Sequence, residues 1–146
     1  MNKTNHSNIL IVGGGCAGIS VATRLHNLKS DLSISIIEPS DQSLYQAAWT
    51  LVGAGAYDKD KTIKPMTEVM PSYVNWIKDH AESFAPESNS VKTSNGEHSY
   101  DYLVVCPGLK INYAGIPGLK ESIGKNNVCT NYSADMAVYT LSLIHI

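Results

Sequence analysis

The sequence predicts an α/β fold, with a parallel sheet, flanking helices and a small antiparallel β-meander. Three observations support this prediction. A short apolar run near the N-terminus leads into a glycine-rich loop and a helical pattern, a second apolar run ends in an acidic residue, and a third follows a hairpin signal near residue 100. Short apolar runs bounded by turn residues are typical of strands that are buried on both faces.

The first strand is predicted at Ile9–Val12, and the loop after it carries three spaced glycines. Gly13, Gly15 and Gly18 fit the spacing G-x-G-x-x-G. In that arrangement the first glycine permits a tight turn, the second lets a diphosphate approach the backbone, and the third lets the helix pack closely on the sheet. The start of the helix would then face the diphosphate. The glycines alone also fit a strand–helix turn that binds nothing.

The second strand favours the binding interpretation. It is predicted at Ser33–Ile37 and ends in Glu38, twenty residues after Gly18. An acidic residue at this distance accepts hydrogen bonds from the two ribose hydroxyls of an adenine dinucleotide, and it would repel a 2′-phosphate. Strand, glycines, helix, strand and acid in this order predict a Rossmann-like dinucleotide-binding unit.

The segment Leu44–Ala56 is rich in aromatic and small residues and nearly uncharged. One interpretation is a short core helix that ends at Gly53. The other is a segment that lies along a planar cofactor, with Gln46 and Trp49 facing it. Composition favours the core helix.

The middle of the chain predicts the meander and a returning parallel strand. Asn95-Gly96 is a strong hairpin signal, and Cys106-Pro107-Gly108 closes the strand after it. Pro65 can open a short helix through about Met70, and Ser133 can cap a last helix. The remaining predicted elements are strands at Tyr73–Ile77, Ala81–Ala85, Val91–Thr93 and Tyr100–Val105, and a helix from Ala134 to about Thr140.

Composition excludes several classes of function. The 146 residues suffice for one domain, and their net charge of −2 comes with no basic run, so nothing indicates nucleic-acid binding. No apolar stretch reaches the roughly 18–20 residues of a membrane-spanning helix. The apolar run after Lys3 resembles a signal peptide, but the glycine loop and Glu38 give that segment another role. We expect residues 1–8 to be a disordered leader.

Three cysteines, Cys16, Cys106 and Cys129, have spacings that fit neither a C-x-x-C motif nor a zinc site. This pattern indicates a reducing compartment or thiols with a redox role. The default interpretation of each cysteine is a small buried apolar residue.

Several segments together resemble sulfide:quinone oxidoreductases, in particular the branch that includes the mitochondrial enzymes. The selective segments are Tyr45-Gln46-x-x-Trp49-Thr50-Leu51-Val52-Gly53-Ala54-Gly55-Ala56, Trp76-Ile77 and Ser99-Tyr100-Asp101-Tyr102-Leu103-Val104-Val105. The resemblance covers about residues 8–140. It implies that residues 9–140 are the N-terminal part of an incomplete FAD-binding domain.

The resemblance implies FAD as the cofactor and assigns it further contacts. Cys16 and Ala17 match the diphosphate loop, and Gln46 matches a position that touches FAD. Ala81 matches a position whose backbone meets the adenine, and Gly108 matches the glycine of an Ala-Thr-Gly turn beside the cofactor. Ala47 replaces the proline that usually follows Tyr-Gln, and Pro107 removes one backbone donor near the cofactor.

In the resembled family, a cysteine pair takes up sulfide and two electrons pass through FAD to a quinone. The motifs that carry the pair lie beyond residue 146, so the resemblance implies an N-terminal fragment with little turnover and weak FAD retention. Cys129 resembles a redox cysteine of a different branch; a buried thiol is the favoured alternative. Cys16 and Cys106 are interpreted as structural.

The resemblance also bears on location and on the chain end. It implies a bacterial protein that is peripherally membrane-associated or cytoplasmic, with membrane contact through C-terminal segments beyond this chain. Residues 141–146 resemble sequencing-adapter read-through. We therefore interpret them as a tail that is not native, with a continued helix as the alternative.

Overall fold

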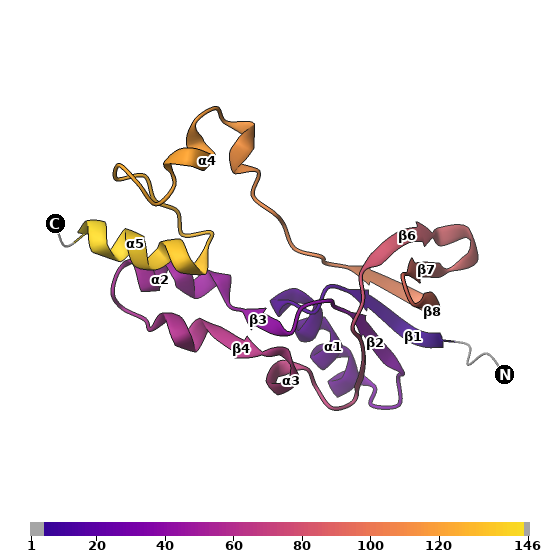
Figure 1. The fold of residues 1–146 in the computed structure, drawn as a ribbon. Helices are drawn as coiled ribbons and strands as arrows, with labels where there is room; N and C mark the ends of the chain where they lie inside the picture. The colour runs from indigo at the N-terminus through magenta and orange to yellow at the C-terminus, as the bar shows by residue number, and fades with distance from the viewer. Residues whose placement is uncertain (1–4, 145–146) are drawn as a thin grey trace. The chain divides into compact units, whose positions relative to one another are not determined.

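The computed structural model describes residues 5–144 (Figure 1). These residues divide into two compact units. The first holds the chain up to Ser43 together with Pro65–Gly108, and the second holds Leu44–Lys64 and the chain from Leu109 onward. The chain leaves the first unit through β3 (Gln42–Leu44) and returns through β4 (Ile63–Pro65), and these two strands pair with each other.

The first unit is built on a six-stranded mixed sheet in the order β5-β2-β1-β8-β7-β6. Strand β1 is parallel to β2 and β8, β2 is parallel to β5, and β6, β7 and β8 run antiparallel. The strands are β1 (Asn5–Val12), β2 (Ile34–Ile37), β5 (Val74–Ile77), β6 (Ala81–Ala85), β7 (Ser90–Thr93) and β8 (Gly96–Val105). The predicted fold class is confirmed, and β5 adds a third parallel strand ahead of the meander.

Helix α1 (Cys16–Leu28) contributes Ala22 to the core on one face of the sheet. Successive residues of β1 serve opposite faces: Ile9 and Ile11 belong to the cluster with Ala22, whereas Leu10 and Val12 belong to a second cluster. Each such buried side chain contributes about 1.5–3 kcal/mol. Burial on both faces explains why β1 is continuously apolar where it meets the glycine loop.

Strand β1 begins at Asn5, four residues earlier than expected. Residues 5–8 were expected to belong to a disordered leader, but they are part of β1, and Asn5, His6 and Ser7 pair with β8. Their polar side chains find partners: Ser7 Oγ lies 2.6 Å from Ser35 Oγ, and Asn8 Oδ1 accepts a hydrogen bond from the Ser33 backbone. The first four residues of the expected leader lie outside the described residues.

The second unit packs short helices around Trp49, Val52 and Ala137. The Trp49 indole is buried and donates a hydrogen bond to Thr62 Oγ1 over 3.1 Å, so the core interpretation is correct for this residue. Helix α2 ends at Gly53 as predicted. The helices of this unit are α2 (Trp49–Gly53), α4 (Leu119–Ser122), α5 (Ala134–Ile144) and the 3₁₀ turns at Gln46–Ala48, Lys59–Thr62 and Tyr113–Gly115.

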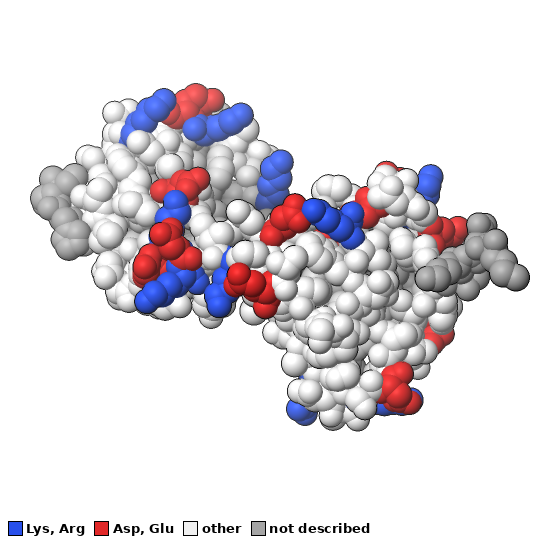
Figure 2. Space-filling view, turned by 60° about the horizontal axis from the view of Figure 1, so that its bottom comes forward, with Lys and Arg blue, Asp and Glu red and all other residues white. Residues whose placement is uncertain are grey.

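Helix α5 continues to Ile144, so four residues of the expected tail are helical. The last two residues of that tail lie outside the described part of the chain. In the first unit, the short helix predicted after Pro65 is α3 (Met66–Val69). Within residues 5–144, no helix is both long enough and apolar enough to cross a bilayer. On the face drawn in Figure 2, basic side chains lie close to acidic ones.

Candidate functional site

The glycine loop begins where β1 ends beside β2 and β8. The Gly13 N–H donates to the Ile37 carbonyl over 2.9 Å, and the Cys106 N–H donates to the Val12 carbonyl over 2.8 Å. Gly13 has φ +106°, and a Cβ there would collide with the Cys106 carbonyl oxygen. Both its left-handed backbone and the close strand therefore require glycine at this position.

The two later glycines differ in their surroundings. A Cβ on Gly18 would collide with the Gly13 carbonyl oxygen, so this glycine lets α1 approach the loop. A Cβ on Gly15 would meet no atom within 4 Å. Gly15 is the N-cap of α1, no side chain caps the helix, and its first turn carries no acid. The exposed backbone from Gly15 to Ala17 can therefore receive an anion at the positive end of the helix dipole.

Glu38, at the end of β2, is held by the glycine loop and by its own turn. Its Oε2 accepts from the Gly14 N–H and its Oε1 accepts from the Ser40 N–H, both over 2.8 Å. The Trp76 indole N–H donates to the Glu38 carbonyl over 2.8 Å. The carboxylate is half-buried, and its remaining lone pairs can accept from ligand hydroxyls.

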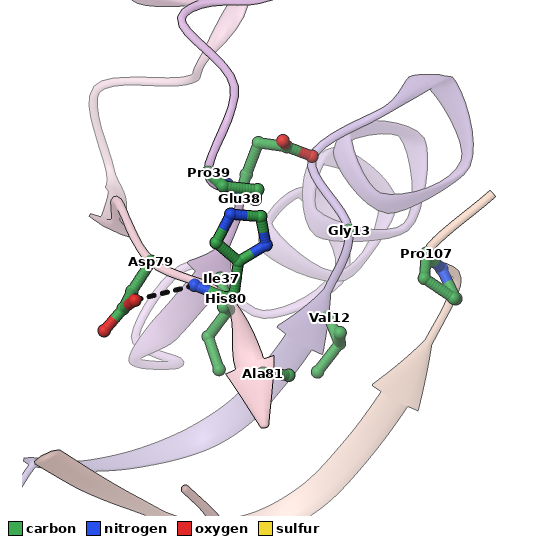
Figure 3. A pocket seen from close by; sticks show the side chains of 9 residues that line it. All are labelled: Val12, Gly13, Ile37, Glu38, Pro39, Asp79, His80, Ala81 and Pro107. Atoms are coloured by element: carbon green, nitrogen blue, oxygen red, sulfur yellow. Dashed lines mark hydrogen bonds between the residues drawn. The ribbon is translucent and has the colours of Figure 1, made fainter. Parts of the chain in front are cut away.

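A cavity of about 220 Å³ lies beside these groups (Figure 3). This volume is smaller than that of sites enclosing a whole drug-sized ligand, and it suits one part of a dinucleotide. Glu38, His80 and Pro107 reach the cavity from three different segments of the first unit. Its lining consists of Val12, Gly13, Ile37, Glu38, Pro39, Asp79, His80, Ala81 and Pro107.

Asp79, in the cavity wall, is buried and accepts four hydrogen bonds. Oδ1 accepts from the His80 N–H over 2.8 Å and from Ser94 Oγ over 2.6 Å. Oδ2 accepts from the backbone N–H and the side-chain amide of Asn95, each over 2.9 Å. The Ser94 hydroxyl, aided by the His80 and Asn95 N–H groups, holds the pKa of this carboxyl well below its usual range despite burial.

Most of the predicted site residues gather in the first unit. Gly13, Glu38 and Ala81 line the cavity, and Gly15, Cys16, Ala17 and Gly18 continue from its rim into α1. Gly108 has φ +78° and is exposed; Pro107, rather than Gly108, lines the cavity. Gln46 belongs to the second unit, where its exposed amide lies 3.4 Å from the Asn131 carbonyl oxygen.

Sequence reasoning missed Gly14, Asp79 and His80. Gly14 was the unassigned middle residue of a glycine run, yet it donates the hydrogen bond that holds Glu38. Asp79 and His80 directly precede Ala81, which the family resemblance had singled out. A predicted strand closely followed by a polar pair was the available signal, because strand ends at the carboxyl edge of an α/β sheet supply ligand contacts.

The cysteines differ from their default interpretation. Cys16 and Cys129 are exposed, so neither is a buried apolar residue. Cys106 is half-buried, with Sγ 3.8 Å from the Gly13 carbonyl oxygen, and burial raises the pKa of its thiol. All three are free thiols, and within the described residues no three His, Cys, Asp or Glu side chains are arranged to hold a metal ion.

Comparison with known proteins points to one class of flavoprotein. The chain is 44% identical to the mitochondrial sulfide:quinone oxidoreductase of Dictyostelium discoideum over 142 residues, and 38% identical to the mouse enzyme over 130 residues. These matches cover 96% and 88% of this chain but only 31% and 29% of the relatives. The chain therefore spans about a third of the length of the relatives it matches.

The fold agrees with the sequence comparison. The structure of the sulfide:quinone oxidoreductase from Aquifex aeolicus superposes with a TM-score of 0.73 at 28% identity, and the match covers 97% of this chain and 32% of that one. Residues 7–137 match the family described as pyridine nucleotide-disulphide oxidoreductase. Because that match includes the glycine loop, Glu38 and the cavity wall, the chain belongs to the pyridine nucleotide-disulphide oxidoreductase family.

Proposed function

We propose that this chain is the FAD-binding N-terminal portion of a sulfide:quinone oxidoreductase. Such an enzyme oxidises sulfide to persulfide or polysulfide sulfur and passes two electrons through FAD to a quinone. The observation that carries the proposal is the arrangement of the Glu38 carboxylate on the Gly14 N–H, next to the open backbone at Gly15.

The residues present fit the adenosine diphosphate part of FAD. The Glu38 carboxylate is fixed by two backbone N–H groups, which leaves lone pairs for the two ribose hydroxyls. The uncapped start of α1, at Cys16 and Ala17, offers N–H donors to the diphosphate. The cavity wall at Ala81 offers backbone groups to the adenine. Gly108, Gln46 and the diphosphate loop are proposed to bind FAD as well.

When bound, FAD supplies a carrier for two electrons. The residues of this chain then have three tasks. The N–H groups at the start of α1 neutralise the diphosphate charge, Glu38 orients the ribose, and the cavity wall excludes water from the adenine. We assign no redox step to the described thiols, and a redox role for Cys129 stays a prediction.

Sulfide as the electron donor and quinone as the acceptor are proposed from the relatives. The relatives with the higher identities are named sulfide:quinone oxidoreductases, at 38–44%. The type II NADH:quinone oxidoreductase of Staphylococcus aureus is 26% identical over 117 residues, which favours NADH as the alternative donor. A flavocytochrome sulfide dehydrogenase or a non-catalytic dinucleotide-binding domain are further alternatives. We propose peripheral membrane association, through segments beyond these residues, or a cytoplasmic location.

The test uses the longest reading frame that contains this chain, reconstituted with FAD. We expect sulfide to bleach the flavin absorbance and to support reduction of a soluble quinone analogue, whereas NADH does neither. A Glu38→Ala variant is expected to purify with less bound flavin. Bleaching by NADH but not by sulfide would overturn the proposal in favour of an NADH dehydrogenase, and the absence of bound flavin would overturn it altogether.

A further inference from the structure

Asp79 connects two segments of the first unit that are distant in sequence. It lies in the loop between β5 and β6, and three of its four hydrogen-bond donors belong to Ser94 and Asn95, which form the turn between β7 and β8. The fourth donor is the backbone N–H of His80, the next residue in the same loop. The carboxylate therefore ties the β5–β6 loop to the β7–β8 hairpin.

The tied loop is a wall of the cavity. His80 follows Asp79 directly, its N–H donates back to Asp79 Oδ1 over 2.8 Å, and His80 and Ala81 both line the cavity (Figure 3). Ser94 and Asn95 do not line the cavity. The hairpin turn therefore reaches this cavity indirectly, through Asp79 and through the pairing of Thr93 with Ala81.

We infer that Asp79 is a positioning residue for the nucleotide cavity, which holds the His80–Ala81 wall in its binding geometry by anchoring it to the Ser94–Asn95 turn. This inference rests on the proposed function, because the occupant is the adenosine part of FAD. The carboxylate suits the task, since it offers only acceptors and every neighbour that it contacts is a donor. Its full satisfaction leaves the loop a single arrangement.

The principal variant is Asp79→Asn, which preserves size but exchanges one acceptor oxygen for an amide donor. One end of the new side chain must then face a donor of the loop or of the hairpin. We expect the Kd for FAD, measured by quenching of flavin fluorescence, to rise about 5- to 30-fold. Asp31→Asn is the matched control, because Asp31 is an exposed aspartate outside the cavity. It is expected to leave the Kd unchanged.

A second pair of variants changes Ser94, the hairpin residue that donates a hydrogen bond to Asp79. Ser94→Ala removes the 2.6 Å hydrogen bond without touching the cavity lining, and Ser94→Thr retains the hydroxyl. We expect Ser94→Ala to raise the Kd for FAD, and we expect Ser94→Thr to keep it near the wild-type value. We also expect faster hydrogen exchange at the His80 amide in Asp79→Asn without any ligand. The Kd values are measured at a temperature where circular dichroism shows every variant to be folded, so an unfolded fraction does not change the apparent affinity, and exchange at the His80 amide is compared with that of amides in β1, which report loss of global stability.

The outcomes separate this inference from the proposed function. All variants are made in the longest reading frame that contains this chain; if the wild-type form of that protein shows no saturable binding of FAD, the proposed function fails and the positioning role fails with it. If the wild-type protein binds FAD while its Asp79→Asn and Ser94→Ala variants bind equally well, the positioning role alone is overturned. Unchanged exchange at the His80 amide in Asp79→Asn would also overturn it, whatever the affinities.

Discussion

The backbone N–H of Gly14 donates a hydrogen bond to Oε2 of Glu38, with 2.8 Å between the two atoms. This contact joins the glycine loop after β1 to the end of β2. A Cβ on Gly14 would lie 2.7 Å from the Glu38 Cβ, so the approach of the two segments depends on glycine. The acid is thereby fixed before a ligand arrives, which lowers the entropy cost of binding.

Glu38→Gln should weaken binding of FAD about 10- to 100-fold, or about 1.4–2.8 kcal/mol. An amide can accept from Gly14 or from Ser40 but not from both, since one of its ends donates. Flavin fluorescence titration measures the effect. Glu82→Gln, on the exposed face of β6, is the matched control. Equal Kd values for the two variants would show that the anchored carboxylate contributes nothing to binding.

Asp79 should make the stability of the chain depend on acid pH. Its folded-state pKa lies well below the usual value of 3.8, mainly because of the Ser94 hydroxyl. A carboxyl of this kind stabilises the fold fully above the unfolded-state pKa and loses that contribution as the pH falls below it. In urea titrations, wild type should therefore exceed Asp79→Asn in unfolding free energy at pH 6, and the gap should narrow below about pH 3.8. A gap independent of pH would contradict this assignment.

His98 should also make the stability of the chain depend on pH, at a higher pH than Asp79 and in the same direction. It is buried beside Thr93, and burial lowers the pKa of its imidazole below 6.5, although the Asp79 carboxylate partly opposes this. The unfolded chain then takes up the proton at a higher pH than the folded chain, so stability is full above about pH 6.5 and decreases below it. We expect the melting temperature of wild type to fall more steeply than that of His98→Gln between pH 7.5 and pH 5. Parallel curves would refute the prediction.

Thiol labelling should separate the three cysteines. Cys16 and Cys129 are exposed and should react quickly with N-ethylmaleimide, whereas Cys106 is half-buried with a raised pKa and should react slowly. The expected pattern, followed by peptide mass spectrometry, is two modifications at early times and a third that appears much later. If Cys106 reacted as fast as Cys16 in the folded chain, the loop around Gly13 would have to be open in solution.

The parts of the fold that sequence predicted best are those set by local apolar patterns. Ile9–Val12 and the residues before Glu38 are apolar because both faces of the strands are covered, and this signal does not depend on the strands' partners. The hairpin near Asn95 was also found, with its two-residue turn at Ser94–Asn95, one position earlier than the motif suggested. The parallel pairing of β5 with β2 was not predicted, because the residue pattern of a strand carries no information about which strand it pairs with.

The second unit and the cavity wall depended on contacts between distant residues. Trp49 packs with Ala137, and composition near residue 49 carries no information about residue 137. Cofactor contact at Gln46 came only from a family resemblance, and Gln46 lies in the second unit while Glu38 and Ala81 share the first. Asp79 was missed for a similar reason, since its donors Ser94 and Asn95 follow it by fifteen or more residues.

Gly15→Ala and Gly18→Ala should separate binding from folding. At Gly18 a Cβ meets the Gly13 carbonyl oxygen, and overpacking of this kind costs about 1–3 kcal/mol of unfolding free energy. At Gly15 a Cβ meets nothing within 4 Å, so the substitution costs only the difference in N-cap preference between glycine and alanine, about 1 kcal/mol or less. Relative to the unfolding free energy that each variant loses, Gly15→Ala should nevertheless weaken FAD binding more than Gly18→Ala does, because its methyl group occupies the space that a diphosphate needs. Urea unfolding and flavin titration measure the two quantities, and normal FAD affinity in Gly15→Ala would place the diphosphate elsewhere.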